Sequence, residues 1–368
     1  MGPVVSGSCS EQESFGSFAL VTVSSSALAR EGITAVLYPS CAWETESGSI
    51  VRILVQGHVY RETCGRVRRL FMHRILERLG GVEVDSIDPR FRHQRMEPFL
   101  RDEAQNLKLR LRVGEESIEL EPTDGRGSVD QVVEIARDRA EKLFGSPGAR
   151  RAASLTLECP ESDEEFSSLP ADSHWLGEEG ISVVSDIDDT IKHSEVHRRR
   201  ELLRNTFTRP FAAVPEMPAI YRKWHEEGAA FHYVSKSPCQ LYLGLREWFD
   251  REGFPPGSFH LRNITFEGQV ARKLFLVPTR VKERHIERLL EWHSSRRFIL
   301  VGDSGEMDAV LYARIFQRYP DRIVKILIRN VPGREMTEER CCVAFEGIPV
   351  ERWSVFDEAE ELIGQCLS

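Results

Sequence analysis

The chain has 368 residues, of which 41% are apolar and 29% are charged, and its formal net charge is −9. This composition is typical of a globular protein that is long enough for two domains. The acidic balance argues against nucleic acid as the main partner, since surfaces that bind nucleic acid are usually basic.

Residues 1–30 are rich in serine, and we expect them to be poorly ordered. They lack the charged start and sustained apolar core of a secretory signal, and the sequence contains no apolar run long enough for a transmembrane helix. The eight cysteines are scattered without any CxxC pair, which argues against a zinc site and for a reducing compartment. We therefore expect a cytoplasmic protein whose contact with membranes, if any, is peripheral.

Residues 31–158 predict a β-rich domain of the α+β class. Residues 51–60 alternate apolar and polar side chains, as a half-buried strand does. Residues 66–81 have apolar side chains at helical spacing and end in two glycines, the usual helix stop. Residues 107–122 predict a hairpin, and residues 129–143 predict a second helix.

Residues 159–178 are acidic and interrupted by prolines, which predicts a linker. Residues 179–368 then alternate short apolar runs with helical segments. Because the runs lack polar alternation, they favour strands buried on both faces of a parallel sheet. We therefore expect an α/β, doubly wound catalytic domain after the smaller β-rich one.

Polar side chains follow three of these apolar runs, and a lysine opens one of the helical segments. In open parallel sheets, ligands bind at the carboxyl ends of the strands, so these side chains should converge at one edge. Carboxylates bind a hard cation, and the cation, a lysine and hydroxyl groups bind phosphate. The candidate residues are Asp186, Asp188, Thr190, Ser235, Lys282, Asp303 and Asp308.

The order of these residues resembles the signature of the haloacid dehalogenase superfamily of phosphatases. That signature is DxDxT, then Ser or Thr at a strand end, then lysine, then acids of the GDxxxxD type. Stretches such as SDIDDTIKHSEV, FHYVSKSPCQLY and RRFILVGDSGEMDAVLY resemble more closely the actin-patch phosphatidate phosphatase family, which is related to the lipins. The resemblance covers residues 179–335, and YPSCAW and GHVYRE extend it loosely toward the N-terminus.

The resemblance implies a Mg²⁺-dependent phosphatase that hydrolyses phosphatidate to diacylglycerol and phosphate. One departure is visible, because the family usually has Pro and an acid after the last aspartate, whereas Ala309 and Val310 follow here. The departure puts only the local loop geometry in doubt. Short intervals between the motifs leave little room for a cap domain, which suits a bulky or membrane-embedded substrate.

The resemblance also implies a role for each candidate. Asp186 is expected to be the nucleophile, and Asp188 the general acid and base. The metal shell would comprise Asp186, the backbone carbonyl of Asp188, and Asp303, with Asp308 close by. Thr190, Ser235 and Lys282 would bind the phosphoryl oxygens. Asp189 occupies a variable position and is expected to bond the backbone instead.

A run of basic residues follows the nucleophile segment, and two interpretations of it stay open. It is either a solvated helix face or a rim that attracts the anionic heads of membrane lipids, with Phe207 and Phe211 dipping into the interface. The basic residues are Arg198, Arg199, Arg200, Arg204 and Arg209.

Two other functions compete with phosphatidate hydrolysis. A phosphatase for a soluble phosphoester would share every motif, so only comparison of substrates separates the two. A non-catalytic phosphatidate-binding module would be expected to lack the nucleophile or the general acid, and both are present here. The sequence predicts neither an oligomeric state nor a ligand for the first domain.

Overall fold

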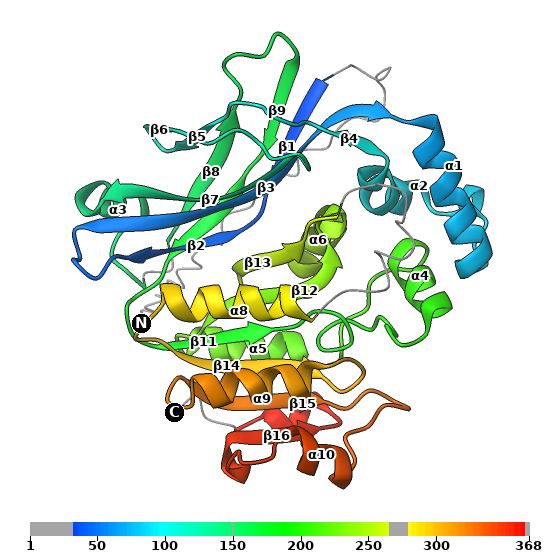
Figure 1. Cartoon of the computed structure of the whole chain (residues 1–368), viewed down its shortest axis with the longest axis vertical. Coiled ribbons are helices and arrows are strands. Elements are labelled where there is room, and N and C mark those ends of the chain that lie inside the picture. Colours follow the sequence, from blue (N-terminus) through cyan, green and yellow to red (C-terminus); the bar gives the residue numbers. More distant parts are fainter. Residues whose placement is uncertain (1–31, 149–150, 265–278, 365–368) are drawn as a thin grey trace, which may run out of the picture. The chain divides into compact units, whose positions relative to one another are not determined.

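A computed structural model describes residues 32–148, 151–264 and 279–364, and the segment expected to be disordered at the N-terminus lies outside these ranges. The described residues belong to one compact unit that contains two β-sheets (Figure 1).

The first sheet has ten strands and is mostly antiparallel. The long strand β3 is central to this sheet and pairs with four other strands, β1, β2, β4 and β7. The strands are β1 (Gly32–Leu37), β2 (Ser40–Glu44), β3 (Ile50–Cys64), β4 (Arg101–Glu103), β5 (Arg110–Val113), β6 (Glu116–Glu119), β7 (Ser128–Ala136), β8 (Ala152–Glu158), β9 (Glu165–Leu169) and β10 (Ala171–Trp175).

Helical segments follow β3 and β7. The predicted helix at residues 66–81 is confirmed and ends at Gly81, which has the left-handed backbone (φ 58°) that glycine adopts without strain. The segments are α1 (Arg66–Ile75), the π-helical turn η1 (Leu76–Gly80), η2 (Val84–Ser86), α2 (Pro89–Phe91), η3 (Arg92–Met96), η4 (Glu97–Phe99) and α3 (Arg137–Phe144).

Two predictions for residues 31–178 are wrong. Residues 129–136 form most of β7 rather than a helix, and α3 begins only at Arg137. The buried residues Val129, Val133 and Ile135 are four and two residues apart, as on one face of a strand, and nine residues of β7 pair with β3. Strand pairing therefore outweighs the helical pattern. Residues 159–178 are not a linker throughout, because β9 pairs with β1 and β10 lies between β8 and β2.

The second sheet is parallel, in the order β13-β12-β11-β14-β15-β16, and it confirms the doubly wound α/β prediction. Its strands are β11 (Ile181–Ser185), β12 (Ala230–Pro238), β13 (Gly257–Arg262), β14 (Arg297–Asp303), β15 (Ile323–Arg329) and β16 (Trp353–Phe356). Its helical segments are α4 (Arg199–Phe207), α5 (Met217–Glu226), η5 (Cys239–Leu241), α6 (Tyr242–Glu252), α8 (Arg280–Trp292), α9 (Asp308–Arg318), α10 (Glu338–Ala344), η6 (Val350–Arg352) and η7 (Ala359–Leu362).

Helices cover both faces of this sheet. Val183 and Val301 share a core with α5 and α6, whereas Val184 and Leu300 share another with α8 and α9. Neighbouring residues of one strand are thus buried on opposite faces, which explains the uninterrupted apolar runs. The arrangement leaves the carboxyl ends of the strands as the edge at which polar groups can gather.

The two sheets also touch. The Phe259 amide donates a hydrogen bond to the Pro39 carbonyl over 2.9 Å, and the rings of Tyr38 and Tyr242 pack edge to face. Residues of both halves therefore share one apolar core, and the boundary between domains stays a prediction.

Candidate active site

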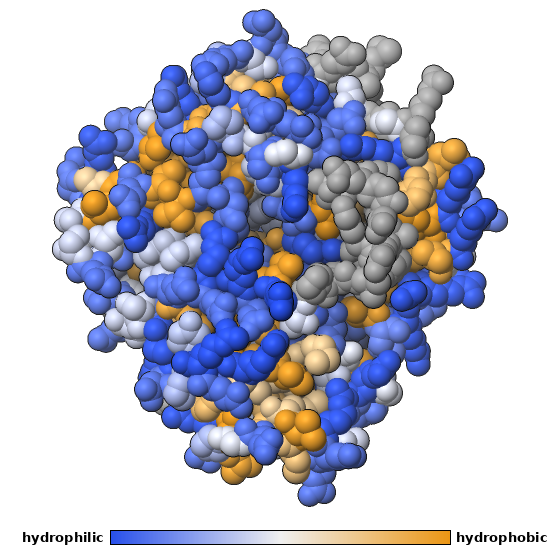
Figure 2. All heavy atoms as spheres, in the orientation of Figure 1, coloured by the Kyte–Doolittle hydropathy of each residue, from blue (hydrophilic) through white to orange (hydrophobic). Residues whose placement is uncertain are grey.

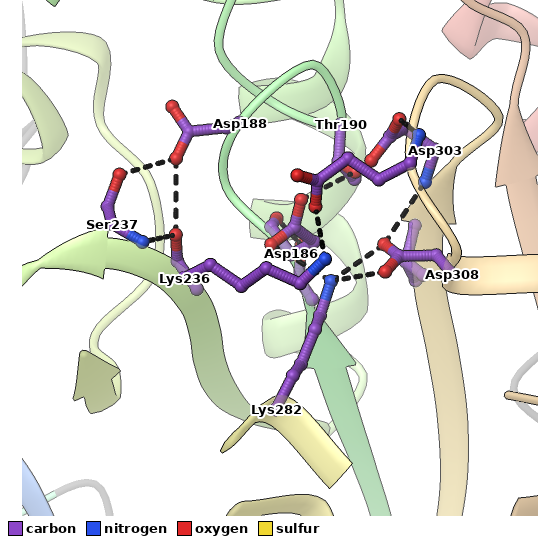
Figure 3. Close-up of polar contacts among 12 residues, drawn as sticks. Asp186, Asp188, Thr190, Lys236, Ser237, Lys282, Asp303 and Asp308 are labelled. Carbon is purple, nitrogen blue, oxygen red and sulfur yellow. Dashed lines mark hydrogen bonds and ion pairs between the residues drawn. The ribbon is translucent and has the colours of Figure 1, made fainter. Parts of the chain in front are cut away.

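The sequence candidates converge at the carboxyl edge of the parallel sheet (Figure 3). Asp186 directly follows β11, Ser235 lies near the end of β12, and Asp303 is the last residue of β14. Lys282 comes from the first turn of α8 and Asp308 opens α9. All five side chains are buried, so the lysine and the three carboxylates among them need partners of opposite charge or hydrogen bonds.

Lys282 is the central cation of this site. Its Nζ lies 3.0 Å from Asp186 Oδ1 and donates to both carboxylate oxygens of Asp308 over 2.7 Å. Burial alone would lower the pKa of Lys282, but the two carboxylates raise it well above its ordinary value. Lys282 therefore remains an ammonium group.

Asp186 is buried among other carboxylates. Burial raises its pKa well above the ordinary value, and Lys282 only partly opposes this effect because Asp308 and Glu306 add negative charge. Thr190 Oγ1 lies 3.5 Å from Asp186 Oδ2, a distance at the limit of a hydrogen bond. Oδ1 is thus fixed by Lys282, whereas Oδ2 is held only weakly.

Asp303 has an unsatisfied carboxylate oxygen. Its Oδ1 accepts hydrogen bonds from the Gly305 and Glu306 amides over 2.7 and 3.0 Å. Its Oδ2 is buried and has no hydrogen-bond partner among the described residues. Burial raises the pKa of Asp303, and the nearby Asp308 and Asp186 raise it further. A buried carboxylate oxygen without a partner suits coordination of a cation.

Three carboxylates could hold that cation. One oxygen each of Asp186, Asp303 and Glu306 lies within 4.8 Å of the others, and oxygen donors of this kind fit a hard divalent ion. Glu306 was not predicted, although it stands in the same GDSGEMD stretch as Asp303. Asp308, which the sequence predicted near the metal, accepts hydrogen bonds from Lys282 with both oxygens.

Asp188 lies apart from this cluster and faces β12. Its Oδ1 lies 2.7 Å from Lys192 Nζ, and its Oδ2 accepts hydrogen bonds from Ser235 and Ser237 over 3.1 and 2.6 Å. Burial would raise the pKa of Asp188, but Lys192 and the serine hydroxyls lower it to about 2. Lys192 was not predicted as a site residue, although a lysine two residues after the DxDxT motif could have indicated a partner for one of its carboxylates.

Asp189 has the local role that the sequence predicts. Its Oδ1 accepts from the Ser194 and Glu195 amides over 2.8 and 2.7 Å, and its Oδ2 accepts from the Val196 amide over 2.7 Å. Its backbone is left-handed (φ 57°), a conformation that aspartate tolerates better than most residues. Asp189 thus folds the loop that follows Asp186.

A pocket of about 190 Å³ opens onto the site. Its polar lining residues are Asp186, Asp188, His197, Arg199, Thr206, Ser235, Lys236, Ser237 and Glu306. Its apolar lining residues are Phe99, Val196, Leu202, Leu203, Phe207, Pro238 and Leu241. The pocket therefore combines the buried carboxylates of the site with apolar side chains, and α4 contributes residues of both kinds.

The basic run is exposed at its start, where Arg198, Arg199 and Arg200 lie at the surface. Arg204 and Arg209 pair with Glu201, and Arg198 lies 3.5 Å from Glu195. Arg199 also lines the pocket.

The interpretation in which Phe207 and Phe211 dip into a membrane interface is wrong, because both are buried. Phe207 packs edge to face against Phe99, and Phe211 packs against Trp248 and lies under the Arg95 guanidinium. Both rings belong to the core that joins the two halves of the chain. The arginines that precede and separate these two rings in the sequence led us to expect an exposed segment.

Comparison with known proteins supports a phosphatase. Residues 181–330 match the family described as phosphatidate phosphatase APP1, catalytic domain. The chain is 30% identical over 217 residues to phosphatidate phosphatase APP1 of Saccharomyces cerevisiae, which covers 57% of this chain and 34% of that protein. It is 29% identical over 187 residues to an uncharacterized protein of Schizosaccharomyces pombe, covering 48% and 29%.

The chain thus spans about a third of the length of the curated relatives that it matches. A solved β-glucuronidase of Parabacteroides merdae covers 84% of this chain and 35% of its own, at 10% identity and a TM-score of 0.24, which carries no argument. Among the described residues, no helix has both the length and the apolar character needed to cross a membrane.

Proposed function

Since the resemblance to the actin-patch phosphatidate phosphatases is confirmed over residues 181–330, we propose that this chain hydrolyses phosphatidate to diacylglycerol and phosphate with Mg²⁺. The observation that carries the proposal is the pocket, whose lining combines polar groups suited to a phosphate with seven apolar side chains. Phosphatidate has the matching form, a phosphate monoester head on an apolar body.

The three carboxylates would hold the metal ion. A divalent cation bound by Asp186, Asp303 and Glu306 would withdraw charge from the phosphoryl oxygens and so ease attack by a carboxylate. The unsatisfied Oδ2 of Asp303 is the observation that favours such an ion. Lys282 supplies a second, permanent positive charge beside Asp186.

The reaction proceeds in two displacements at phosphorus. Asp186 Oδ2, the oxygen that Lys282 does not hold, attacks the phosphorus, and the bond from phosphorus to the glyceride oxygen breaks. The bonding electrons leave with the glyceride oxygen, which takes a proton from Asp188 and becomes diacylglycerol. Water then attacks the phosphorus of the aspartyl-phosphate, and Asp188 accepts its proton as phosphate leaves.

The resting charge of Asp188 fits the second displacement directly. With a pKa of about 2, Asp188 is ionised and ready to accept a proton from water. For the first displacement it must carry a proton, and a bound phosphate dianion would raise its pKa by adding negative charge nearby. Lys192, 2.7 Å from Asp188 Oδ1, would then set how readily that proton is held.

We also propose peripheral contact with an anionic membrane through the exposed arginines of α4. Arg200 packs against Gly81 at the end of η1, so α4 and η1 lie side by side. The neighbouring α1 and η1 expose Arg74, Arg78 and Leu70, the last with 55% of its surface accessible. Figure 2 shows apolar side chains among hydrophilic ones over α1. Basic and apolar side chains together suit a membrane surface.

One panel of substrates tests the proposal. Purified protein, with Mg²⁺ or with a chelator, is given phosphatidate, lysophosphatidate, diacylglycerol pyrophosphate and a generic aryl phosphate. We expect Mg²⁺-dependent turnover that is fastest on phosphatidate in micelles. Turnover of the aryl phosphate alone would establish a phosphatase for soluble esters, and binding of phosphatidate without turnover would establish a binding module.

A further inference from the structure

Lys236 is a cation of the pocket to which the proposed reaction assigns no role. It lies on β12 between Ser235 and Ser237, and its side chain, 13% exposed, lines the pocket. Its backbone carbonyl accepts a hydrogen bond from Arg262 Nε over 2.9 Å, which fixes the strand end that carries it. The side chain starts beside the hydroxyls that hold Asp188 and extends toward the acidic cluster (Figure 3).

The far end of Lys236 meets a residue of that cluster. Its Nζ lies 3.0 Å from Glu306 Oε2, and Glu306 is one of the three carboxylates grouped within 4.8 Å. An ammonium group on Glu306 and a divalent cation beside it would repel each other at such short range. The carboxylate therefore has two competing cations, one of which belongs to the chain.

The other two lysines of the site have no such freedom. Lys282 is fully buried between Asp186 and Asp308, and Lys192 is buried against Asp188. Lys236 is joined by one ion pair, at the surface of the pocket, through a long and flexible stem. It is thus the lysine of this set that can change partners without leaving a buried carboxylate unpaired.

We propose that Lys236 is a phosphate-binding residue that rests on Glu306 while the carboxylate cluster lacks a cation. When a cation takes Glu306, the ammonium group turns to the phosphate in the pocket, where Ser235 and Ser237 already face. The ligand is a phosphate dianion, either inorganic phosphate or the head of a phosphate monoester. The part that concerns a monoester substrate rests on the proposed function, whereas the exchange at Glu306 does not.

Calorimetry on the purified full chain, stripped of metal, tests both halves of this exchange. Mn²⁺ is titrated first, and inorganic phosphate is then titrated into the Mn²⁺-saturated protein. For Lys236→Met we expect Mn²⁺ to bind about tenfold more tightly and phosphate about tenfold more weakly than in wild type. Lys236→Arg should retain phosphate binding, and Lys223→Met, an exposed lysine of α5, should match wild type in both titrations.

Glu306→Gln gives a second measurement that needs no cation. Since this variant releases Lys236, we expect its metal-free form to bind inorganic phosphate several-fold more tightly than metal-free wild type. Circular dichroism and thermal unfolding show that each variant is folded.

The outcomes separate the two proposals. Unchanged or weaker Mn²⁺ binding in Lys236→Met, or unchanged phosphate binding, would overturn the exchange while leaving the phosphatase intact. Wild type that binds no Mn²⁺ would overturn the exchange together with the metal dependence of the proposed function. Phosphate that binds equally well to all variants would show that Lys236 does not contact it.

Discussion

Replacing Asp303 with asparagine should stabilise the metal-free protein and abolish its stabilisation by divalent cations. The substitution keeps the oxygen that accepts from the Gly305 and Glu306 amides, and it replaces the buried, unpartnered Oδ2 with a neutral group. The new amide can donate to the carboxylates beside it. The perturbation therefore removes a charge while preserving the shape of the loop.

The magnitude follows from the cost of a buried polar atom without a partner, about 1–3 kcal/mol. For a domain of 150–250 residues, each kcal/mol moves the melting temperature by about 2–4 °C. The sign depends on pH. Because burial raises the pKa of Asp303 in the folded protein, its ionisation destabilises the fold progressively as pH rises above the unfolded value of about 4. The gain from Asp303→Asn should thus be larger at about pH 8 than at about pH 5.

Thermal unfolding in chelator and in Mg²⁺ at both pH values measures these effects. Wild type should gain stability from Mg²⁺, about 2.7 kcal/mol when the ion is at a hundred times its dissociation constant, and the variant should gain none. Asp163→Asn, which neutralises an exposed carboxylate of the first half, serves as the matched control. The reasoning is refuted if Asp303→Asn melts below wild type in chelator at the higher pH and still responds to Mg²⁺.

Three further predictions follow from neighbouring contacts. Lys192→Met removes the cation beside Asp188, so the pKa of Asp188 should rise from about 2. The acid limb of the kcat–pH profile should then move to higher pH. An acid limb that does not move would contradict the role of Lys192 in setting the pKa of Asp188. In wild type, ionised Asp188 contributes stability that is lost only as pH falls from about 4 toward 2. Asp189→Ala should lower the free energy of unfolding in urea by about 2–4 kcal/mol, because three backbone amides lose their acceptor and alanine disfavours the left-handed backbone. Asp189→Asn should lower it less, and equal losses would argue against the role of Asp189 in folding this loop. The double variant Arg198→Glu, Arg200→Glu should sediment at least about tenfold less well with vesicles containing phosphatidylglycerol than the charge-matched pair Lys223→Glu, Arg284→Glu, whereas equal sedimentation would exclude Arg198 and Arg200 as the contact.

The sequence predicted the parallel sheet and the convergence of most candidate residues because both depend on local signals. Uninterrupted apolar runs marked strands buried on two faces, and Asp186, Ser235 and Asp303 stood at or near the ends of three of them. The strand β7 was missed because its valines also fit a helical spacing, and pairing with β3, 70 to 86 residues away in the chain, decided between them. The strands β9 and β10 were missed because acidic residues and prolines predicted a linker, whereas β9 pairs with the distant β1 and β10 pairs with both β8 and the distant β2.

The contacts within the site were harder to predict than its members. The motif spacing brought Asp308 to the site, but only the fold shows that both its oxygens engage Lys282. Lys192, Lys236 and Glu306 stood beside recognised motif residues, and nothing in their spacing revealed which carboxylate or lysine each would meet. Burial of Phe207 and Phe211 depends on the first half of the chain packing against them, which no local pattern records.

The central claim is that Asp186 attacks the phosphorus of phosphatidate, and trapping the phosphorylated enzyme tests it most directly. Phosphatidate labelled with ³²P in its head group is mixed with excess enzyme and Mg²⁺, quenched in acid within one turnover, and digested. The account predicts label on the peptide that contains Asp186, released by hydroxylamine, and neither label nor turnover in Asp186→Asn. Undiminished hydrolysis of phosphatidate by Asp186→Asn would contradict it.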